Sequence, residues 1–452
     1  PRGARQTRRA GKAAILADAP RAPRRPTYNP PMSASSDPLR TDVAVVGRGA
    51  VGVAAALALS RAGLSTVLVG APPVADALDE SDAWDLRVFA LSPATRRLLE
   101  SIDAWQALDV QRVAPVYDMR VFPAFGSQND ELHFSAYESC IEALAWIVEQ
   151  RNLMRALDGA QHAAGLQVVD ERFESFDDAA QLVSAAPAPY VRLVLDGGRR
   201  IEARLVVGAD GASSRVREAA GIDSRVSDYP QRALVAHFDT SLSHRDVAWQ
   251  WFGEQGVLAL LPLPVTPGLP QVPAGRVSMV WAAPHDLADE LQAMTPEQLA
   301  ARVQQATGSA LGAMTSISRV AGFPLRLARA SSLIAPRVAL VGDAAHVVHP
   351  LAGQGMNLGF GDVEALARTL RERETMRDPG DRLLLRRYER ARAEPVAAMR
   401  RTTDGLQRLF DPVRPLAPEP IGAFLRSFVA MGWRAVARSG WIRKRLVARA
   451  VR

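Results

Sequence analysis

A glycine-rich turn between an apolar run and a small-residue run constrains the fold of this chain more than any other feature. Residues 41–70, TDVAVVGRGAVGVAAALALSRAGLSTVLVG, read as a strand, a tight turn, a helix and a second strand. The turn carries the G-x-G-x-x-G spacing at Gly47, Gly49 and Gly52. The first glycine permits the turn, the second lets the backbone approach a pyrophosphate, and the third brings the helix close to the strand. The segment predicts an α/β fold that opens with a Rossmann-like unit.

The acidic residue that usually holds the adenosine ribose of such a unit is missing. It is expected at the end of the second strand, about 20 residues after the glycines, where this chain has Gly70. Asp76, Asp79 and Glu80 are nearby substitutes, and water is another. The unit by itself leaves NAD and FAD open, and a glycine turn without a ligand is the alternative.

Two later apolar strands end in an aspartate. LVVGADGASSRVR places Asp210 and Gly211 after one strand, and VALVGDAAH places Asp343 after another. Because α/β sheets bind ligands at the carboxyl ends of parallel strands, both acids are predicted to reach the edge that carries the glycine turn. Either acid could instead only cap the helix that follows it.

Together the three motifs resemble the FAD-binding set of the single-component (class A) flavin aromatic hydroxylases. From about Thr41 onward, further segments resemble the ubiquinone-biosynthesis hydroxylases of that family in order and spacing. They are LRVFALSPATRRLLESIDAW, LHFSAY, WIVEQRNLMRAL, LALLPLP, VSMVW, HPLAGQGMNLGFGDVEALA and RRYERARAEPVAAMRRTTDGLQRLF. The resemblance implies an FAD-binding Rossmann-like domain of the glutathione-reductase type, interleaved with a β-sheet substrate domain and followed by C-terminal helices.

These patterns set the expected domain boundaries. The discontinuous FAD-binding domain is predicted at residues 41–112, 144–229 and 319–410, and the substrate domain at residues 113–143 and 230–318. In the substrate domain, RALVAHFDT, AWQWFGEQGVLALLPLP and RVSMVWAAP read as strands. Their aromatic residues could line a ring pocket, although strand aromatics more often belong to a core. These aromatics are Trp249, Trp251, Phe252 and Trp281.

The resemblance also implies which residues contact FAD. Asp210 and Gly211 match the segment near the pyrophosphate and the nicotinamide route, and Asp343 matches the acid that hydrogen-bonds the ribityl chain. The loop HPLAGQGMN would pass beneath the flavin ring, with Pro350 beside the isoalloxazine. Gly353 would let the loop backbone approach the ring.

The helix after this loop is expected to face the reduced flavin. Gly355 lets the backbone come close, and the helix that begins near Met356 and Asn357 would point its positive end at the N1/C2 edge. The helix dipole and amides would stabilise the reduced anion by about 1 to 2 kcal/mol.

Four further side chains have alternative roles. Arg87 and Arg151 would lie against the FAD phosphates or ribityl chain, or else be surface residues of an arginine-rich chain. His346 and His349 are predicted to shape the ring's surroundings, because flavin oxygenation needs no protein nucleophile. No catalytic residue is assigned. A single cysteine, Cys140, excludes a Cys-rich metal site, and the two histidines are not spaced with other ligands as in a metal site, so no metal is expected.

The reaction implied by the resemblance is hydroxylation of the aromatic ring of a ubiquinone precursor, a polyprenyl phenol. NAD(P)H, a transient co-substrate, would reduce the bound FAD, and O2 would then form a C4a-hydroperoxide that transfers one oxygen to the ring. The alternatives are a flavin oxidoreductase of another class, such as a prenyl-chain reductase, and a non-catalytic FAD-binding partner in a quinone-biosynthesis complex. Other ubiquinone-biosynthesis proteins are candidate partners.

Positive charge is concentrated at the two ends. Residues 1–31 hold seven Arg and one Lys against one Asp, and residues 421–452 hold seven Arg, one Lys and no acid. The middle is acidic, which argues against a nucleic-acid-binding surface. The leader, residues 1–40, is predicted to be disordered and not native, with Met32 as the true start; a mitochondrial presequence is the alternative.

The last 42 residues, 411–452, are predicted to form a basic helical tail. Its aromatic residues, among them Trp441, would suit peripheral contact with the inner membrane, or the tail packs on the acidic body. No run reaches the roughly 18 apolar residues of a spanning helix, and one cysteine is typical of a reducing compartment. A cytoplasmic location is therefore expected.

Overall fold

The computed structural model describes residues 38–72, 84–123, 131–177, 189–253, 255–265, 273–348, 355–410 and 439–450. Most of the predicted leader lies outside these residues. So do several residues singled out from the sequence: Asp76, Asp79, Glu80, His349, Pro350 and Gly353.

A mixed sheet holds the glycine-rich unit at its centre. Five of its strands are mutually parallel and follow the order β19-β11-β1-β2-β8. Their bounds are Val338–Leu340 for β19, Arg200–Gly208 for β11, Leu39–Val46 for β1, Thr66–Val69 for β2 and Gln167–Val169 for β8. Small or β-branched apolar residues dominate these strands, as strands covered on both faces require.

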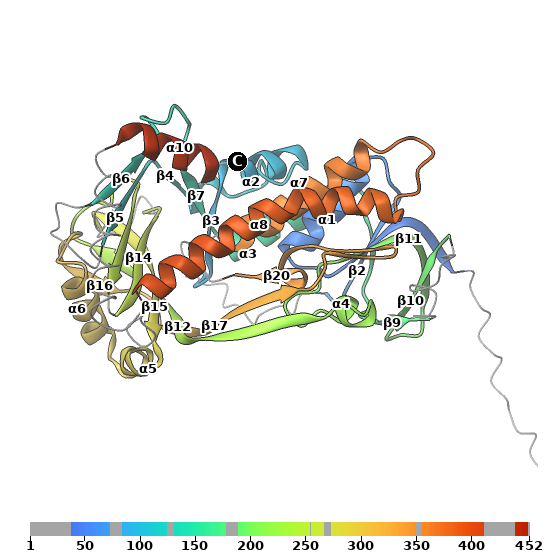
Figure 1. The fold of residues 1–452 in the computed structure, drawn as a ribbon. Coiled ribbons are helices and arrows are strands. Elements are labelled where there is room, and N and C mark those ends of the chain that lie inside the picture. Colours follow the sequence, from blue (N-terminus) through green and yellow to red (C-terminus); the bar gives the residue numbers. More distant parts are fainter. Residues whose placement is uncertain are drawn as a thin grey trace, which may run out of the picture. The chain divides into compact units, whose positions relative to one another are not determined.

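Helices cover one face of this sheet. The main ones are α1 (Ala50–Arg61), α3 (Gln150–Ala163), α7 (Gly355–Arg371) and α8 (Arg382–Phe410), and α2 (Pro93–Ser101) packs against α7. Alanine and glycine make up much of α1, so this helix lies close to the strands and to α7 (Figure 1).

The opposite face is covered by short elements. They are the antiparallel strands β9 (Phe173–Phe176) and β10 (Val191–Leu195) and helix α4 (Arg215–Ala219). Strand β18 (Ile334–Ala335) pairs with β19.

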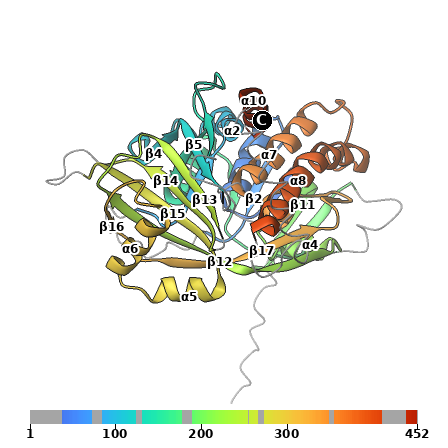
Figure 2. The same cartoon turned by 60° about the vertical axis from the view of Figure 1, so that its left-hand side comes forward.

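A second sheet follows the order β20-β17-β12-β15-β14-β13-β5-β6, with β16 beside β12. In chain order its strands are β5 (Asp118–Phe122), β6 (Leu132–Ser135), β12 (Ser224–Thr240), β13 (Val247–Gly253), β14 (Gly256–Leu263), β15 (Gly275–Pro284), β16 (Met314–Ser316), β17 (Ala321–Ala330) and β20 (His346–Val347). Helices α5 (His285–Ala293) and α6 (Pro296–Ala306) pack on one face of it (Figure 2). The core beneath them includes Phe238 and Trp281.

A small third sheet lies between these parts. It has the order β3-β7-β4, with bounds Val88–Leu91 for β3, Ala145–Glu149 for β7 and Val113–Val116 for β4. Short helices η1 (Val110–Arg112) and η4 (Gly342–Ala344) and helix α10 (Gly440–Ala450) complete the described elements.

Strand β12 crosses a predicted domain boundary, and strand β17, which falls in the predicted FAD-binding segment 319–410, belongs to the second sheet. Strand β12 begins at Ser224, before the boundary at residue 230, and pairs along most of its length with β17. Strand β17 in turn pairs with β20, which follows directly after η4. The division into two domains stays a prediction, but this ribbon physically joins the second sheet to the segment that carries Asp343.

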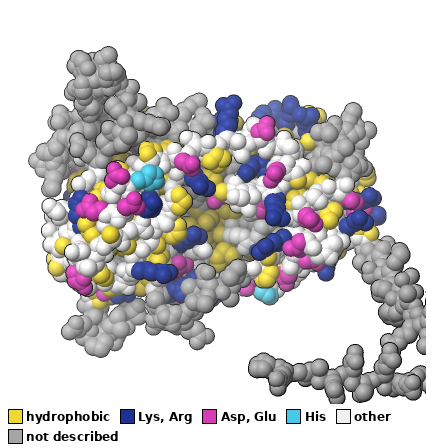
Figure 3. All heavy atoms as spheres, turned by 90° about the horizontal axis from the view of Figure 1, so that it is seen from below, with side chains coloured by type: hydrophobic (Ala, Val, Ile, Leu, Met, Phe, Trp, Pro, Cys, Tyr) yellow, Lys and Arg dark blue, Asp and Glu magenta, His cyan; other side chains and the backbone are white. Residues whose placement is uncertain are grey.

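Two surface properties bear on possible partners. Seen from below, Lys and Arg side chains are interspersed with acidic and hydrophobic ones (Figure 3). Among the described residues, no helix combines the length and apolar character needed to cross a bilayer.

Candidate functional site

Five parallel strands bring the predicted residues to one edge of the first sheet. In the strand order β19, β11, β1, β2, β8, the residues at or just beyond the strand ends are Asp343, Asp210, Gly47, Gly70 and Asp170. The carboxyl ends of parallel strands in an open α/β sheet are where such folds bind ligands.

The glycine turn has two closed positions and one open position. Gly47 has φ of +120°, and a Cβ there would lie 2.2 Å from the Ala209 carbonyl oxygen. A Cβ on Gly52 would lie 1.9 Å from the Gly47 oxygen. At Gly49, which precedes α1, a Cβ would meet nothing within 4 Å. The start of α1 is thus an accessible helix N-terminus of the kind that binds phosphate.

Asp210 both caps a helix and retains an unpartnered oxygen. Its Oδ2 accepts a hydrogen bond from the Val216 N–H of α4 at 3.1 Å, so Asp210 does cap the helix that follows it. Its Oδ1 is buried and has no hydrogen-bond partner among the described residues. Such an atom is costly unless a donor reaches it. Gly211, next in the chain, has φ of +86° and open space beside it.

Asp343 presents a carboxylate beside the start of α1. Gly342, just before it, has φ of +61° and packs on Val51, the second residue of α1, with a Cβ-to-Cγ1 distance of 3.1 Å. The Asp343 side chain is exposed, so a ligand can reach it. The protein atoms around it nevertheless raise the pKa of its carboxyl, an effect that His346 partly offsets. No described residue hydrogen-bonds to this carboxylate, which suits hydroxyl donors on a ligand.

Arg217 joins the two aspartate loops, and sequence reasoning missed it. Its Nη1 donates to the Ala344 carbonyl and its Nη2 to the Ala212 carbonyl, both at 2.9 Å. The available signal was an arginine seven residues after Asp210 within the same motif.

A buried ionic cluster lies directly behind the Asp343 segment. Asp362 of α7 is fully buried and accepts hydrogen bonds from Arg392 Nε at 2.6 Å and from the Gly342 N–H at 2.9 Å. His346 Nε2 lies 2.7 Å from Asp362 Oδ2, but the angle falls short of a directed hydrogen bond, so we treat this contact as electrostatic. Burial disfavours the Asp362 charge most, yet these partners outweigh it and keep the pKa below its usual value. His346 therefore has a structural contact, as a packing role predicts.

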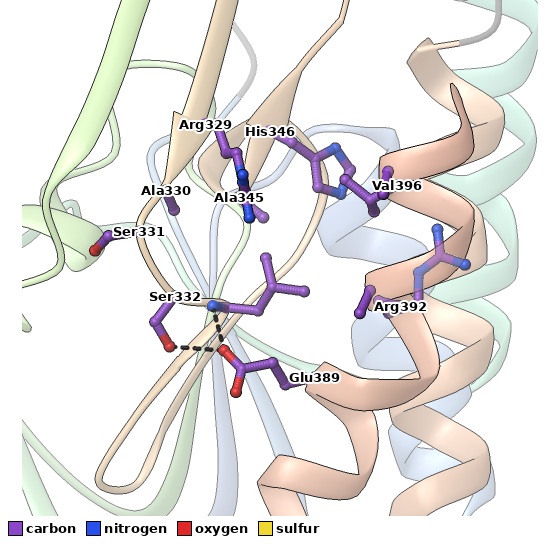
Figure 4. Close-up of a pocket in the computed structure, with 12 residues that line it drawn as sticks. Arg329, Ala330, Ser331, Ser332, Ala345, His346, Glu389, Arg392 and Val396 are labelled. Carbon is purple, nitrogen blue, oxygen red and sulfur yellow. Dashed lines mark hydrogen bonds between the residues drawn. The ribbon is translucent and has the colours of Figure 1, made fainter. Parts of the chain in front are cut away.

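A pocket of about 130 Å³ opens between α8 and strands β17 and β20 (Figure 4). It is lined by Arg329, Ala330, Ser331, Ser332, Leu333, Ala345, His346, Glu389, Arg392, Ala393, Val396 and Ala397. Glu389 accepts hydrogen bonds from the Ser332 hydroxyl at 2.8 Å and the Leu333 N–H at 3.1 Å. The lining includes His346 but none of the residues predicted to bind FAD directly, so we do not assign this pocket to the cofactor.

The side chain of Asn357, a predicted FAD contact, anchors the start of α7 to the segment between β3 and α2. Asn357 Nδ2 donates to the Ala90 carbonyl at 2.7 Å, and its Oδ1 accepts from the Ser92 N–H at 2.9 Å and the Thr95 hydroxyl at 2.8 Å. Met356 packs against the core, and α7 begins at Gly355. Backbone N–H groups, not the Asn357 amide, are what α7 offers at this end.

Arg87 and Arg151 are brought together by Asp85, which sequence reasoning also missed. Asp85 Oδ1 accepts from the Arg87 N–H and Oδ2 from the Arg151 N–H, each at 3.0 Å. The Arg87 guanidinium lies over the Phe323 ring at 4.9 Å. The Asp85 carbonyl lies 3.0 Å from His237 Nε2, so two residues of the second sheet hold this segment.

The aromatic residues of the second sheet do not form one pocket. Trp249 and Trp251 stack with Phe122, with ring centroids 6.0 and 5.5 Å away. Trp281 is buried in the core beneath α5 and α6, and Phe252 belongs to a cluster on the opposite face. The core alternative holds for Trp281.

Comparison with known proteins gives consistent results. A family model described as an FAD binding domain matches residues 40–403. The ubiquinone hydroxylase UbiL of Rhodospirillum rubrum is 35% identical over 394 residues, covering 85% of both chains. The ubiquinone biosynthesis monooxygenase COQ6, mitochondrial, of Homo sapiens is 32% identical over 411 residues, covering 82% of this chain and 85% of the relative. The structure of Pseudomonas aeruginosa PqsL in complex with 2-aminobenzoylacetate aligns with a TM-score of 0.66 at 23% identity, covering 88% of this chain and 100% of PqsL.

Proposed function

Since the chain belongs to the family of FAD-binding monooxygenases that includes ubiquinone-biosynthesis hydroxylases, we propose that it hydroxylates the aromatic ring of a polyprenyl phenol, a ubiquinone precursor. The observation that carries the proposal is the convergence of the glycine turn, Asp210 and Asp343 on one sheet edge, in a chain of this family. Bound FAD would supply the redox and oxygen chemistry, with NAD(P)H as electron donor.

The described residues fit FAD along that edge. The open position at Gly49 suits the pyrophosphate, and the buried Oδ1 of Asp210 needs a donor. Asp343 is an acceptor suited to ribityl hydroxyls, and Gly355, which is partly exposed, begins helix α7. Arg87, Arg151 and the loop residues Pro350 and Gly353 stay predicted contacts, together with Gly211, Met356 and Asn357.

We assign the substrate to one face of the second sheet. Side chains alternate along β12, so Ala233, Val235 and His237 share a face, and His237 contacts Asp85 on the cofactor side. The cross-strand partners Ala282 and Val280 continue this face on β15. Apart from His237, the residues named are small and apolar; Val280 is partly exposed, whereas the face under α5 and α6 is closed. Such a wall would accept an aromatic ring with a prenyl chain and exclude water from the reacting oxygen.

Helix α10 packs on the body with one side and leaves the other side exposed for contact with a membrane. Val447 is buried and Arg443 pairs with Glu138 at 3.6 Å, so one side packs on the body. Trp441 is 68% exposed, and Lys444 and Arg445 are exposed beside it. We propose that this outer side contacts an anionic bilayer, where a membrane-dissolved substrate would be reached. A cytoplasmic location at the inner membrane follows only as part of this proposal.

Vesicle pelleting tests the membrane contact. Trp441→Ala combined with Lys444→Ala should reduce pelleting with anionic vesicles, whereas Leu242→Ala, an exposed apolar control elsewhere, should not. Equal pelleting of all three proteins would contradict the membrane proposal and leave the enzymatic one standing.

Substrate-dependent oxygen uptake tests the reaction. With FAD and NAD(P)H, a polyprenyl phenol should increase O2 consumption and yield a product with one added oxygen atom by mass spectrometry. A prenyl-chain reductase would reduce the substrate's prenyl chain without substrate-dependent O2 consumption. In a non-catalytic partner, NAD(P)H would not reduce the bound flavin. Rescue of strains that each lack one ring hydroxylase would then identify the ring position.

A further inference from the structure

The strand end where the ribose-binding acid is missing lies beside another acid. Strands β2 and β8 run in parallel, with Val69 opposite Val169. The next residues are Gly70 and Asp170, so these two stand at the same level of the sheet edge. The Gly70 N–H donates to the Val169 carbonyl at 3.1 Å, which extends the pairing to this point.

Arg48 crosses the end of β2 to reach Asp170. A Cβ on Gly70 would lie 3.0 Å from Arg48 Cγ, so a side chain there would crowd this path. Arg48 Nη1 pairs with Asp170 Oδ1. The Arg48 side chain is 13% exposed and that of Asp170 is 67% exposed. The arginine is therefore packed, and among the described residues no contact engages Asp170 Oδ2.

We propose that Asp170 takes the place of the missing acid and accepts hydrogen bonds from the ribose hydroxyls of the FAD adenosine, with Arg48 holding it in position. The strand order supports this assignment. Phosphates belong at the start of α1, after β1, and the ribose follows over β2. Asp170 ends the next strand, only about 4.8 Å farther along the edge. The inference rests on FAD binding, and it does not depend on the ring hydroxylation proposed above.

A plain surface ion pair is the competing explanation. Such a pair would hold edge strand β8 and contribute little to the stability of the fold. The affinity for FAD would not depend on it. A matched control exists in Asp228, whose side chain is 70% exposed and pairs with Arg326 at 3.1 Å in the β12–β17 ribbon.

Binding of nucleotides to the full-length apoprotein separates the two explanations. FAD affinity is measured by fluorescence titration, and ADP and 2′,3′-dideoxy-ADP are compared as competitors. Wild type should bind ADP about tenfold or more tightly than the dideoxy analogue, as for hydrogen bonds to a charged group. Asp170→Ala should weaken FAD by a similar factor and abolish the preference for ADP, and Asp228→Ala should change neither.

Two results would overturn the assignment: an Asp170→Ala protein that still prefers ADP, or a wild-type protein without any preference. Asp170→Asn keeps the size of the side chain and therefore controls for misfolding. It should lose less FAD affinity than Asp170→Ala, and its preference for ADP should fall in the same direction. Thermal unfolding of each apoprotein checks the fold. Because no turnover is involved, a failure of the oxygen-uptake experiment leaves this result unaffected.

Discussion

In the glycine turn, folding and FAD binding depend on different glycines. Alanine substitutions at Gly52 and Gly49 can therefore distinguish the two effects. A Cβ on Gly52 would lie 1.9 Å from the Gly47 oxygen, whereas real Cβ contacts stay beyond 3.0 Å. Helix α1 would therefore have to move by at least about 1.1 Å, and such overpacking costs about 1 to 3 kcal/mol. Gly52→Ala should destabilise the apoprotein by this amount and also weaken FAD.

Gly49→Ala should behave differently. Gly49 has φ of −75°, and a Cβ added to it would meet nothing within 4 Å, so alanine fits without strain. Alanine caps the helix less well than glycine, which destabilises the folded state, but it also lowers the conformational entropy of the unfolded state, which favours folding. The two effects oppose each other, so apoprotein stability should stay within about 1 kcal/mol of wild type. The methyl group would enter the space expected for the pyrophosphate, so we expect at least a roughly tenfold loss of FAD affinity, or about 1.4 kcal/mol.

Urea unfolding of the apoproteins and FAD fluorescence titration together test this pair. Gly52→Ala should lose both stability and FAD affinity, whereas Gly49→Ala should lose FAD affinity only. Wild-type FAD affinity in the Gly49→Ala protein would show that the phosphates do not lie at the start of α1.

Three further predictions concern titratable side chains: Asp343, Asp362 and His237. Asp343→Asn should lower FAD affinity in calorimetric titration while leaving the apoprotein as stable or more so, because its surroundings raise the pKa of the carboxyl; a less stable apoprotein would contradict this. Asp362→Asn leaves the charge of Arg392 uncompensated in the core and should reduce the free energy of unfolding by about 3 to 5 kcal/mol, measured in urea; a loss below about 1 kcal/mol would show that the cluster is dispensable. Burial lowers the pKa of His237, so the folded state binds fewer protons than the unfolded state at acid pH. Stability should therefore be present above about pH 6.5 and fall below it by up to about 1.4 kcal/mol per pH unit, and His237→Gln should flatten this slope in unfolding curves from pH 5 to 8.

The sequence was most informative where the signal is local. The glycine spacing and the apolar runs that end at Asp210 and Asp343 predicted the parallel strands and the shared edge, because each motif lies within one strand and the turn after it. The fold class, the FAD cofactor and the flavin-monooxygenase family are confirmed. The individual cofactor contacts stay predictions.

Partners far apart in the chain escaped sequence reasoning. Asp85 joins the backbones of Arg87 and Arg151, and no local pattern pairs segments more than 60 residues apart. Asn357 stays a predicted cofactor contact through its backbone, but no local pattern announced that its side chain hydrogen-bonds to the β3–α2 junction over 260 residues earlier. Asp210 shows that a capping role and a ligand role need not exclude each other, since its two oxygens have different surroundings.

The bridge made by Arg217 has a consequence for the kinetics of cofactor exchange. One guanidinium fixes the spacing between the loops of Asp210 and Asp343 through two backbone carbonyls. The apoprotein would therefore enter the encounter with this part of the site already preorganised, and little ordering entropy would oppose FAD at that point. Because the FAD contacts proposed above involve both loops, and the Arg217 bonds hold these loops together, FAD release should be slow.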